Sequence, residues 1–280
     1  MQYRTVIPAP SKKPLFVIVG VSNEPGDVSR SYSYVLVVGM LTQSSPLTGV
    51  STARLFARKG YRIALISLGK EALNKLTKEL QSDGEAAAFP VADYTPNSIR
   101  SAFTSIRSRF PPATSPLRVA LFNVGNGVQK HFLDITDNDV RYSFDVNVAA
   151  FAFSHEVITA FSKLGFEDLS EGGKGGSRKK GTLLFTGTTA SIHGSTTTSA
   201  FAAEKHALRA LAQSLAKEFG EKNIHIAHSI IDGDFLTERN GGNDTRLDSA
   251  SIAKSYLNLV QQDSTAWTWE IDLRPAHKKW

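Results

Sequence analysis

Short apolar runs alternate with amphipathic stretches along nearly the whole chain. Runs of this kind, rich in Val, Ile, Leu and Phe, are typical of buried strands, whereas the stretches between them show helical periodicity. Strands that alternate with helices predict βαβ units and a parallel sheet covered on both faces. We therefore predict an α/β fold with a single doubly wound parallel sheet, which binds its ligand at the carboxyl ends of the strands.

The predicted strands cover residues 15–19, 62–67, 86–91, 118–122, 182–185, 224–231 and 267–271. The predicted helices cover residues 52–59, 71–82, 96–110, 138–164, 199–219 and 249–260. No internal repeat and no second domain are visible, and a chain of 280 residues with 41% hydrophobic composition can bury one large core. We expect a single domain over residues 1–280, with its core in 14–280.

The composition excludes several classes of chemistry. The chain has no Cys, which rules out disulfides, thiolate catalysis and Cys-based metal sites and suits a reducing compartment. Residues 1–14 lack the apolar stretch of a secretory signal, and the apolar run at 35–41 is too short to span a bilayer. We expect a cytoplasmic protein without a membrane partner.

The net charge of +6 includes a local basic cluster at Lys174, Arg178, Lys179 and Lys180. Glycines surround these residues and no aromatic side chain lies among them, so the pattern favours a solvated, mobile loop over a nucleic-acid site. A small-molecule substrate is the expected partner, and nucleic acid is not.

Landmarks in a fixed order narrow the function. They are Gly20 after the first strand, Gly49 before the predicted first helix, Asp93 after the third strand, Asn123-Val-Gly125 after the fourth, Asp145-Val-Asn147 in the long helix, and Asp232-Gly233 with Thr237 after the sixth strand. From about Pro14 to the C-terminus, this order resembles the short-chain dehydrogenase/reductase family. Those proteins are nicotinamide-dependent oxidoreductases with a Rossmann fold.

The resemblance implies a set of cofactor-binding residues. It implies that Gly20 and Gly49 flank the phosphate-binding turn and that Asp93 contacts the adenine amine. It matches Asn123 and Gly125 to the family's segment after the fourth strand, although the first Asn of that segment is replaced by Phe122. It also matches Gly233 to the glycine of the family's Pro-Gly after the sixth strand, with Asp232 in place of the Pro, and Thr237 to the Thr that contacts the nicotinamide carboxamide.

The same resemblance gives the catalytic tetrad Asn147, Thr188, Phe201 and Lys205. Thr188 lies 13 positions before Phe201, where the family has its catalytic Ser, and it keeps a hydroxyl that can polarise a carbonyl. Lys205 is retained, and the resemblance implies that it also binds the nicotinamide ribose. Phe201 stands at the position of the catalytic Tyr, one helical turn from Lys205, so the usual phenol acid is absent.

Two roles stay open for Phe201: an apolar residue packed under the cofactor, or a residue that shapes an altered pocket. Ser191, His193 and Glu204 are nearby in sequence and could replace the phenol. His193 is the better acid on chemical grounds, because an imidazole titrates near neutral pH. Residues in such positions are more often solvent-facing, so the proton donor stays unassigned.

The glycine-rich turn is interrupted. Gly20 and Gly49 are 29 positions apart where the family has six, and removing residues 21–43 restores the family spacing. Our hypothesis is that this 23-residue segment is a retained intron or a mis-predicted exon. Val21-Ser22 can be encoded as a splice donor and Gln43 as an acceptor. A genuine insertion that forms a lid or a partner loop is the alternative. Leu47 replaces the middle glycine in either case.

The end of the second strand bears on the choice of nucleotide. An NAD enzyme of this fold usually has an acidic residue there, but this chain has Ser67, Leu68, Gly69 and Lys70 before Glu71. Ser67 and Lys70, with Arg54 more distant, could receive a 2′-phosphate, which favours NADP over NAD. Basic residues at a helix start are the alternative reading.

Three functions follow. The first is an NADP-preferring oxidoreductase that acts on a carbonyl or an alcohol by hydride transfer. The second is a pseudoenzyme that binds dinucleotide or a protein partner without turnover. The third is a chain that binds no nucleotide, because its phosphate loop is interrupted.

The two long helices carry apolar residues on more than one face, so we expect a homodimer or homotetramer.

Overall fold

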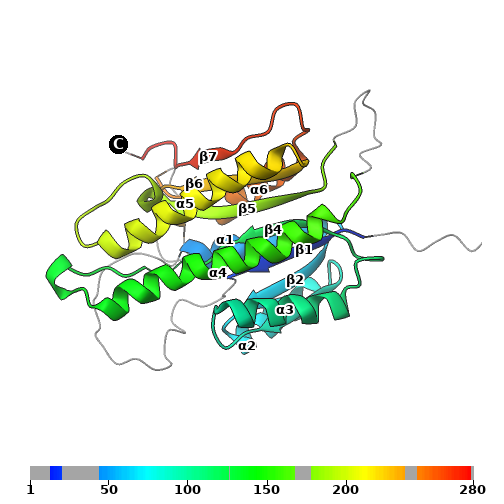
Figure 1. The fold of residues 1–280 in the computed structure, drawn as a ribbon, viewed down its shortest axis with the longest axis horizontal. Coiled ribbons are helices and arrows are strands. Elements are labelled where there is room, and N and C mark those ends of the chain that lie inside the picture. Colours follow the sequence, from blue (N-terminus) through cyan, green and yellow to red (C-terminus); the bar gives the residue numbers. More distant parts are fainter. Residues whose placement is uncertain (1–12, 21–43, 126, 168–177, 237–244, 279–280) are drawn as a thin grey trace, which may run out of the picture.

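Within the residues that the structure describes, seven parallel strands form one sheet in the order β3-β2-β1-β4-β5-β6-β7. The computed structural model describes residues 13–20, 44–125, 127–167, 178–236 and 245–278. The strand order reverses between β1 and β4, which is the arrangement of a doubly wound sheet. The predicted fold class is confirmed (Figure 1).

The strands are β1 (Leu15–Val19), β2 (Arg62–Ser67), β3 (Ala86–Pro90), β4 (Leu117–Phe122), β5 (Gly181–Thr188), β6 (Ile224–Ile231) and β7 (Glu270–Leu273). The helices are α1 (Ser44–Arg58), α2 (Lys70–Leu80), α3 (Pro96–Arg109), α4 (Asp137–Ser162), α5 (Ser199–Gly220) and α6 (Ser249–Gln261). Two short 3-10 turns, η1 (Phe132–Asp134) and η2 (Thr189–Ser191), follow β4 and β5.

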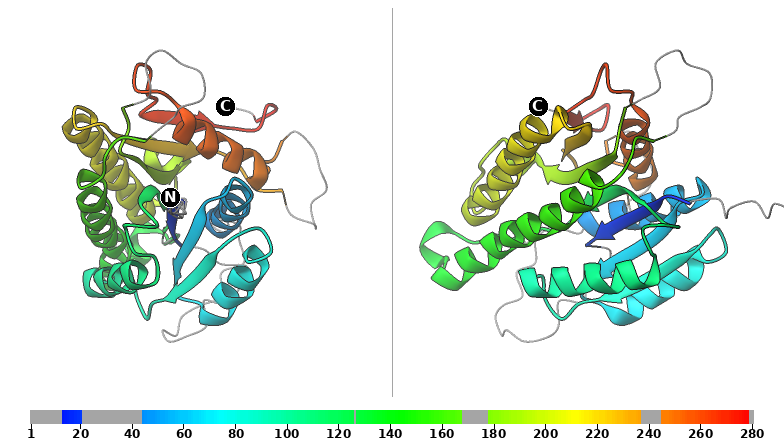
Figure 2. Two further views of the ribbon diagram at one scale, coloured as in Figure 1. Left: turned by 90° about the vertical axis from the view of Figure 1, so that its right-hand side faces the viewer. Right: turned by 45° about the vertical axis from the view of Figure 1, so that its right-hand side comes forward.

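In the described part of the chain, three helices cover each face of the sheet (Figure 2). Apolar residues of α3, α4 and α5 pack on one face with Val17, Phe122 and Phe185. Those of α1, α2 and α6 pack on the other with Ile18 and Leu65. Because both faces of the strands are covered, β1 is buried along its whole length, as its uninterrupted apolar run predicts.

Local signals set the helix starts. The Thr95 side chain accepts the N–H of Ser98 and Pro96 occupies the first turn of α3, where a missing N–H costs nothing. A capping box of Thr136 and Asp139 begins α4. These caps fix where each helix leaves the carboxyl edge of the sheet, and therefore where the side chains of its first turns lie.

The first helix starts eight residues earlier than the sequence pattern predicts, at Ser44 instead of Thr52. Gly49 consequently lies inside α1 and not at its entrance. The last strand is shifted as well, because it covers Glu270–Leu273 where we predicted 267–271. The hypothesis about residues 21–43 and the prediction for Thr237 fall outside the described residues.

Lys179 corrects the prediction of a solvated basic loop. Only 1% of its surface is exposed, and its ammonium donates to the backbone carbonyls of Val260 and Gln262. The Glu167 carboxylate lies 3.8 Å away. Burial lowers the pKa of Lys179, against the attraction of Glu167. Lys179 therefore binds the last carbonyls of α6. Arg178 is exposed and Lys180 is half-buried, and Lys174 lies outside the described residues.

Within the described part of the chain, no helix combines the length and the apolar content that crossing a bilayer requires.

Candidate active site

The carboxyl ends of all seven strands lie at one edge of the sheet, so the residues that follow β1, β4, β5 and β6 share that edge. Gly20 follows β1 with φ +84°, in the left-handed region that favours glycine. A Cβ on Gly20 would lie 2.5 Å from the backbone oxygen of Asn123, and the Asn123 side-chain amide donates to the Gly20 carbonyl at 3.0 Å. The exits of β1 and β4 are thus joined, and a glycine is required there.

Lys205 lies buried on α5 at the exit of β4. Its Nζ donates to the Val124 carbonyl at 3.0 Å and lies 3.4 Å from Oε1 of Glu204. A Cβ on Gly125 would lie only 2.6 Å from this Nζ, so the absence of a side chain at Gly125 makes room for the ammonium. The structure therefore brings Lys205, Glu204 and Gly125 together.

Phe201 faces Lys205, as the four-residue spacing predicts. Its ring centroid lies 5.8 Å from the Lys205 Nζ, within the range of a cation–π contact. The ring is buried with Ala190 and Ala202 in a small apolar cluster. An apolar ring therefore lies beside the cation at the position where the resemblance places a phenol.

Thr188 ends β5 and is half-buried. Its Oγ1 accepts the N–H of Ala190 at 3.1 Å, which leaves the hydroxyl proton available for a substrate oxygen. On α4, Asn147 is 8% exposed, and within the described structure neither atom of its side-chain amide has a hydrogen-bond partner. Buried polar groups are nearly always satisfied, so this amide marks a place for a water or a ligand. The residues around the nicotinamide position therefore fit the cofactor that the resemblance implies.

The three substitutes for the phenol have different environments. His193 is exposed. Ser191 is fully buried, and its Oγ accepts the N–H of Thr188 at 3.1 Å. Glu204 is fully buried beside Lys205. The expectation of solvent-facing positions holds for His193 and is wrong for Ser191 and Glu204, because η2 and α5 turn these two side chains inward.

The residues considered for the 2′-phosphate are partly engaged elsewhere. Ser67 is buried and forms a hydrogen bond with the hydroxyl of Tyr94. Burial raises the pKa of Tyr94, and the hydrogen bonds with Ser67 and the Leu68 backbone oppose that rise. Arg54 is paired with Glu79 at 2.6 and 2.9 Å. Lys70 is the first residue of α2 and is exposed. It is therefore the most accessible of these three residues for a 2′-phosphate.

Two further predicted positions are well defined. Asp93 lies between β3 and α3, where its Oδ1 accepts hydrogen bonds from the Ser98 and Thr95 hydroxyls and the Thr95 N–H. These bonds lower the pKa of Asp93. Gly233 follows β6, and a Cβ there would lie 2.8 Å from Pro275, so the chain after β7 packs closely on it.

Asp232, which stands where the resemblance expects Pro, forms a buried ionic cluster that the sequence did not predict. Its carboxylate is 2% exposed, accepts hydrogen bonds from Lys278 and Thr189, and lies 2.8 Å from Arg274. Burial opposes ionisation of Asp232, but these partners outweigh it and lower the pKa. The signal in the sequence was an acidic residue directly after a buried strand.

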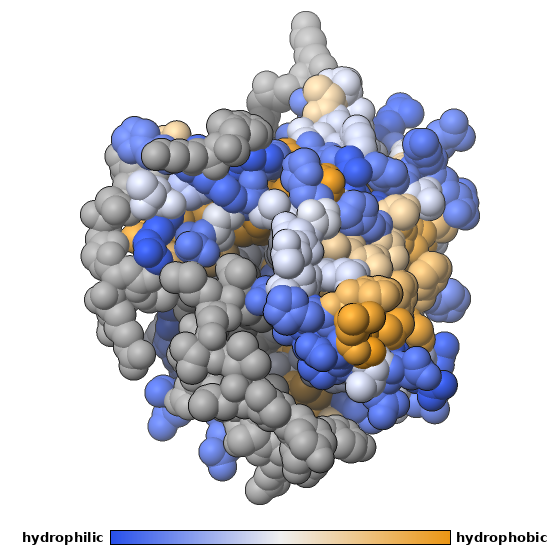
Figure 3. Space-filling model, turned by 90° about the vertical axis from the view of Figure 1, so that its left-hand side faces the viewer, coloured by the Kyte–Doolittle hydropathy of each residue, from blue (hydrophilic) through white to orange (hydrophobic). Residues whose placement is uncertain are grey.

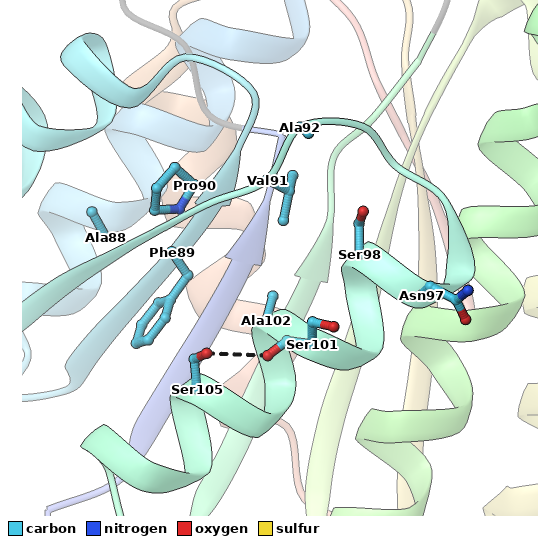
Figure 4. A pocket seen from close by; sticks show the side chains of 10 residues that line it. All are labelled: Ala88, Phe89, Pro90, Val91, Ala92, Asn97, Ser98, Ser101, Ala102 and Ser105. Atoms are coloured by element: carbon cyan, nitrogen blue, oxygen red, sulfur yellow. Dashed lines mark hydrogen bonds between the residues drawn. The ribbon is translucent and has the colours of Figure 1, made fainter.

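A cavity of 530 Å³ lies between β3 and α3, and Figure 4 shows the side chains that line it. It is lined by Ala88–Ala92 on one side and by Asn97, Ser98, Ser101, Ala102 and Ser105 on the other. None of the predicted site residues that the structure describes lines this cavity. The cavity lies at the outer edge of the sheet, so it is separate from the cluster around Lys205.

The sequence profile of the short chain dehydrogenase family matches residues 40–246. The chain therefore belongs to the short chain dehydrogenase family, a family of oxidoreductases. The match begins at residue 40, near the end of the segment 21–43, so β1 lies outside it.

Similar proteins and solved structures include oxidoreductases and short-chain dehydrogenases. An uncharacterized oxidoreductase of Bacillus subtilis (strain 168), YxnA, is 30% identical over 112 residues, which is 39% of this chain and 30% of that protein. The match thus spans less than a third of the curated relative. The crystal structure of a short-chain dehydrogenase from Rhodopseudomonas palustris is 27% identical and superimposes with a TM-score of 0.70, covering 93% of this chain and 98% of the other. An alcohol dehydrogenase from the archaeon Thermococcus sibiricus, complexed with 5-hydroxy-NADP, shares the fold with a TM-score of 0.72 at 17% identity, over 96% and 99% of the two chains.

Proposed function

We propose that the protein is an NAD(P)-dependent oxidoreductase that interconverts a carbonyl and an alcohol in a small-molecule substrate. The observation that carries this proposal is the buried ammonium of Lys205, held by the Val124 carbonyl at the exit of β4. A buried cation at the carboxyl edge of a doubly wound sheet suits the binding of a ribose and an anionic cofactor. Family membership and the 5-hydroxy-NADP complex of the archaeal dehydrogenase support the cofactor class.

In this proposal each residue has one role. Thr188 donates a hydrogen bond from its hydroxyl to the substrate carbonyl oxygen and polarises the carbonyl. Lys205 binds the nicotinamide ribose, and the amide of Asn147 holds a relay water. The nicotinamide, when bound, supplies or accepts the hydride. Gly20, Asn123 and Gly125 keep the backbone close to the cofactor, because a Cβ on either glycine would collide with its neighbours.

The source of the proton distinguishes an active oxidoreductase from a pseudoenzyme. Phe201 has no hydroxyl, so the acid must be another group, and Glu204 and His193 are the candidates with a carboxyl or an imidazole. If neither acts, the protein is a pseudoenzyme that binds dinucleotide without turnover. Calorimetry with NADPH tests binding, and NADPH absorbance with a vicinal diketone tests turnover. Absence of NADPH binding would refute both readings.

We also propose a cytoplasmic location, because a chain without Cys suits a reducing compartment.

We further propose that NADP is preferred over NAD, with Lys70 as the main determinant. Lys70→Glu is expected to erase or reverse the preference, because the ribose phosphate would then face a like charge at the start of α2. Lys78→Glu is the matched control, since it makes the same charge change on an exposed residue near the other end of α2. Calorimetry with NADPH and NADH measures both. Tighter binding of NADH to the unchanged protein would refute the preference.

We also propose that the protein self-associates through an apolar face of α4. Val140, Phe144, Val148 and Phe151 recur at intervals of four and three residues on α4, and all are 39–61% exposed. Such spacing puts them on one face of the helix. Apolar residues gather on the side of the molecule where α4 lies (Figure 3). A contiguous apolar face of this kind suits burial against a second copy of the chain, so we propose a homodimer or homotetramer.

Phe144→Asp and Phe151→Asp are each expected to shift the protein toward the monomer, because a charge would be buried in the proposed interface. Phe166→Asp is the control, since Phe166 is 51% exposed, which is comparable to Phe144 and Phe151, but lies after the end of α4. Light scattering at micromolar concentration measures the mass. A monomeric mass for the unchanged protein would contradict the assembly.

A further inference from the structure

His228 is a fully buried imidazole on β6 that the proposed chemistry does not use. Its Nδ1 lies 3.0 Å from Oε2 of Glu270 on β7. Both oxygens of that carboxylate accept from the guanidinium of Arg209 on α5, each at 2.7 Å. A partly exposed ion pair therefore fixes one side of the buried ring.

The environment determines the tautomer of His228. Burial lowers its pKa to about 4, against the attraction of Glu270, so the ring is neutral near pH 7. A neutral imidazole has one N–H, and the nitrogen that faces a carboxylate carries it. Nδ1 is therefore the donor and Nε2 is an acceptor. Within the described structure, Nε2 is buried and has no hydrogen-bond partner.

Ser191 supplies the complementary group. Its Oγ accepts the N–H of Thr188 at 3.1 Å, so the hydroxyl proton still needs an acceptor. The His228 Nε2 and the Ser191 Oγ converge on the same space, which is empty only because residue 187 is a glycine. A Cβ on Gly187 would lie 2.2 Å from Nε2 and 2.7 Å from Oγ. No hydrogen bond joins the two atoms in the described structure, but both border the position that a side chain at residue 187 would take, and each lacks the partner that the other offers.

We propose that Glu270, His228 and Ser191 form a buried relay of hydrogen bonds that positions Thr188, the residue that polarises the substrate carbonyl. Glu270 orients the ring, Nε2 accepts the Ser191 hydroxyl, and the Ser191 oxygen holds the backbone N–H of Thr188. The backbone at Thr188, from which the hydroxyl projects, is then held by a buried support and not by the substrate. A donor that is already oriented costs no reorganisation during the reaction. The catalytic benefit rests on the proposed function, whereas the relay itself does not.

Imidazole ¹⁵N NMR on the full chain labelled in His tests the relay without any substrate. The expected result is a Nδ1-protonated tautomer for His228 and a shift of its Nε2 resonance in Ser191→Ala. His225 is an internal control on the same strand, because its Nε2 lies 2.8 Å from the Thr268 carbonyl and has no link to Ser191. A resonance of His228 Nε2 that does not change in Ser191→Ala overturns the relay.

The second measurement is hydrogen exchange of the Thr188 amide. We expect His228→Asn to speed it by about tenfold, since loss of the acceptor loosens Ser191. Unchanged exchange in a folded His228→Asn protein overturns the positioning role, and Ser191→Ala is the second variant if His228→Asn does not fold. If the unchanged protein reduces a vicinal diketone, Ser191→Ala should lower kcat about tenfold with little change in KM. A protein that shows the NMR coupling but no turnover refutes the proposed function and leaves the relay intact.

Discussion

Phe201→Tyr is expected to raise carbonyl-reductase turnover by about 10²–10⁴-fold, the usual range for a positioned proton donor. The ring of Phe201 lies 5.8 Å from the Lys205 ammonium, so a phenol there would have its pKa lowered by that charge. Thr188 already offers a hydroxyl at the same edge of the sheet, so the tyrosine would complete the site. Initial rates of NADPH oxidation with a vicinal diketone measure the change.

Phe219→Tyr is the matched control. It adds the same hydroxyl to a ring 4.4 Å from the ammonium of Lys222, at the far end of the same helix, and should leave turnover unchanged. If another acid already acts, Phe201→Tyr should do little and His193→Ala or Glu204→Gln should abolish turnover. If the protein is a pseudoenzyme, none of these variants turns over, while Lys205→Ala still weakens NADPH binding. Strong turnover that survives Lys205→Ala would contradict every one of these readings.

The second prediction is a loss of stability between pH 6.5 and pH 4. Burial lowers the pKa of both His225 and His228 to about 4. Because the unfolded chain then binds more protons than the folded one in this window, stability rises with pH there and is lost as the pH falls from 6.5 toward 4. At about 1.4 kcal/mol per pKa unit, each histidine contributes on the order of 3 kcal/mol. Urea unfolding at pH 7 and pH 4.5 measures the difference.

The histidine contribution is identified by how the free energy of unfolding changes with pH, and not by its value at one pH. His228→Asn is expected to remove about half of the loss, whereas His155→Gln changes an exposed imidazole on α4 and should leave the loss unchanged. The pKa of Glu270 is lowered in the folded protein, so protonation of this carboxyl also destabilises the fold. This effect adds to the loss of stability at the acidic end of the pH range. Equal free energies of unfolding at the two pH values would show that the histidines are not buried as neutral groups.

The fold could be predicted because its signals are local. The strand at Leu15–Val19 and the start of α3 at Pro96 each follow from neighbouring residues, and both were predicted correctly. The start of α1 was misplaced because Ser44, Ser45, Pro46 and Leu47 do not show the apolar periodicity that marks the rest of the helix. The spacing of Phe201 and Lys205 is another local signal, and it predicted correctly that the two side chains face each other.

The sequence by itself determined the doubly wound sheet, the family and the residues available for the chemistry, since periodicity and motif spacing are properties of neighbouring positions. Tertiary structure alone decided which polar groups are buried and with whom they pair. Lys179 turned inward because α6 ends against it, and Ser67 was taken up by Tyr94 from another strand's loop. His228, within an apolar strand, gained Glu270 from β7 and the space over Gly187 from β5. Such pairings depend on contacts between distant segments, which no local pattern records.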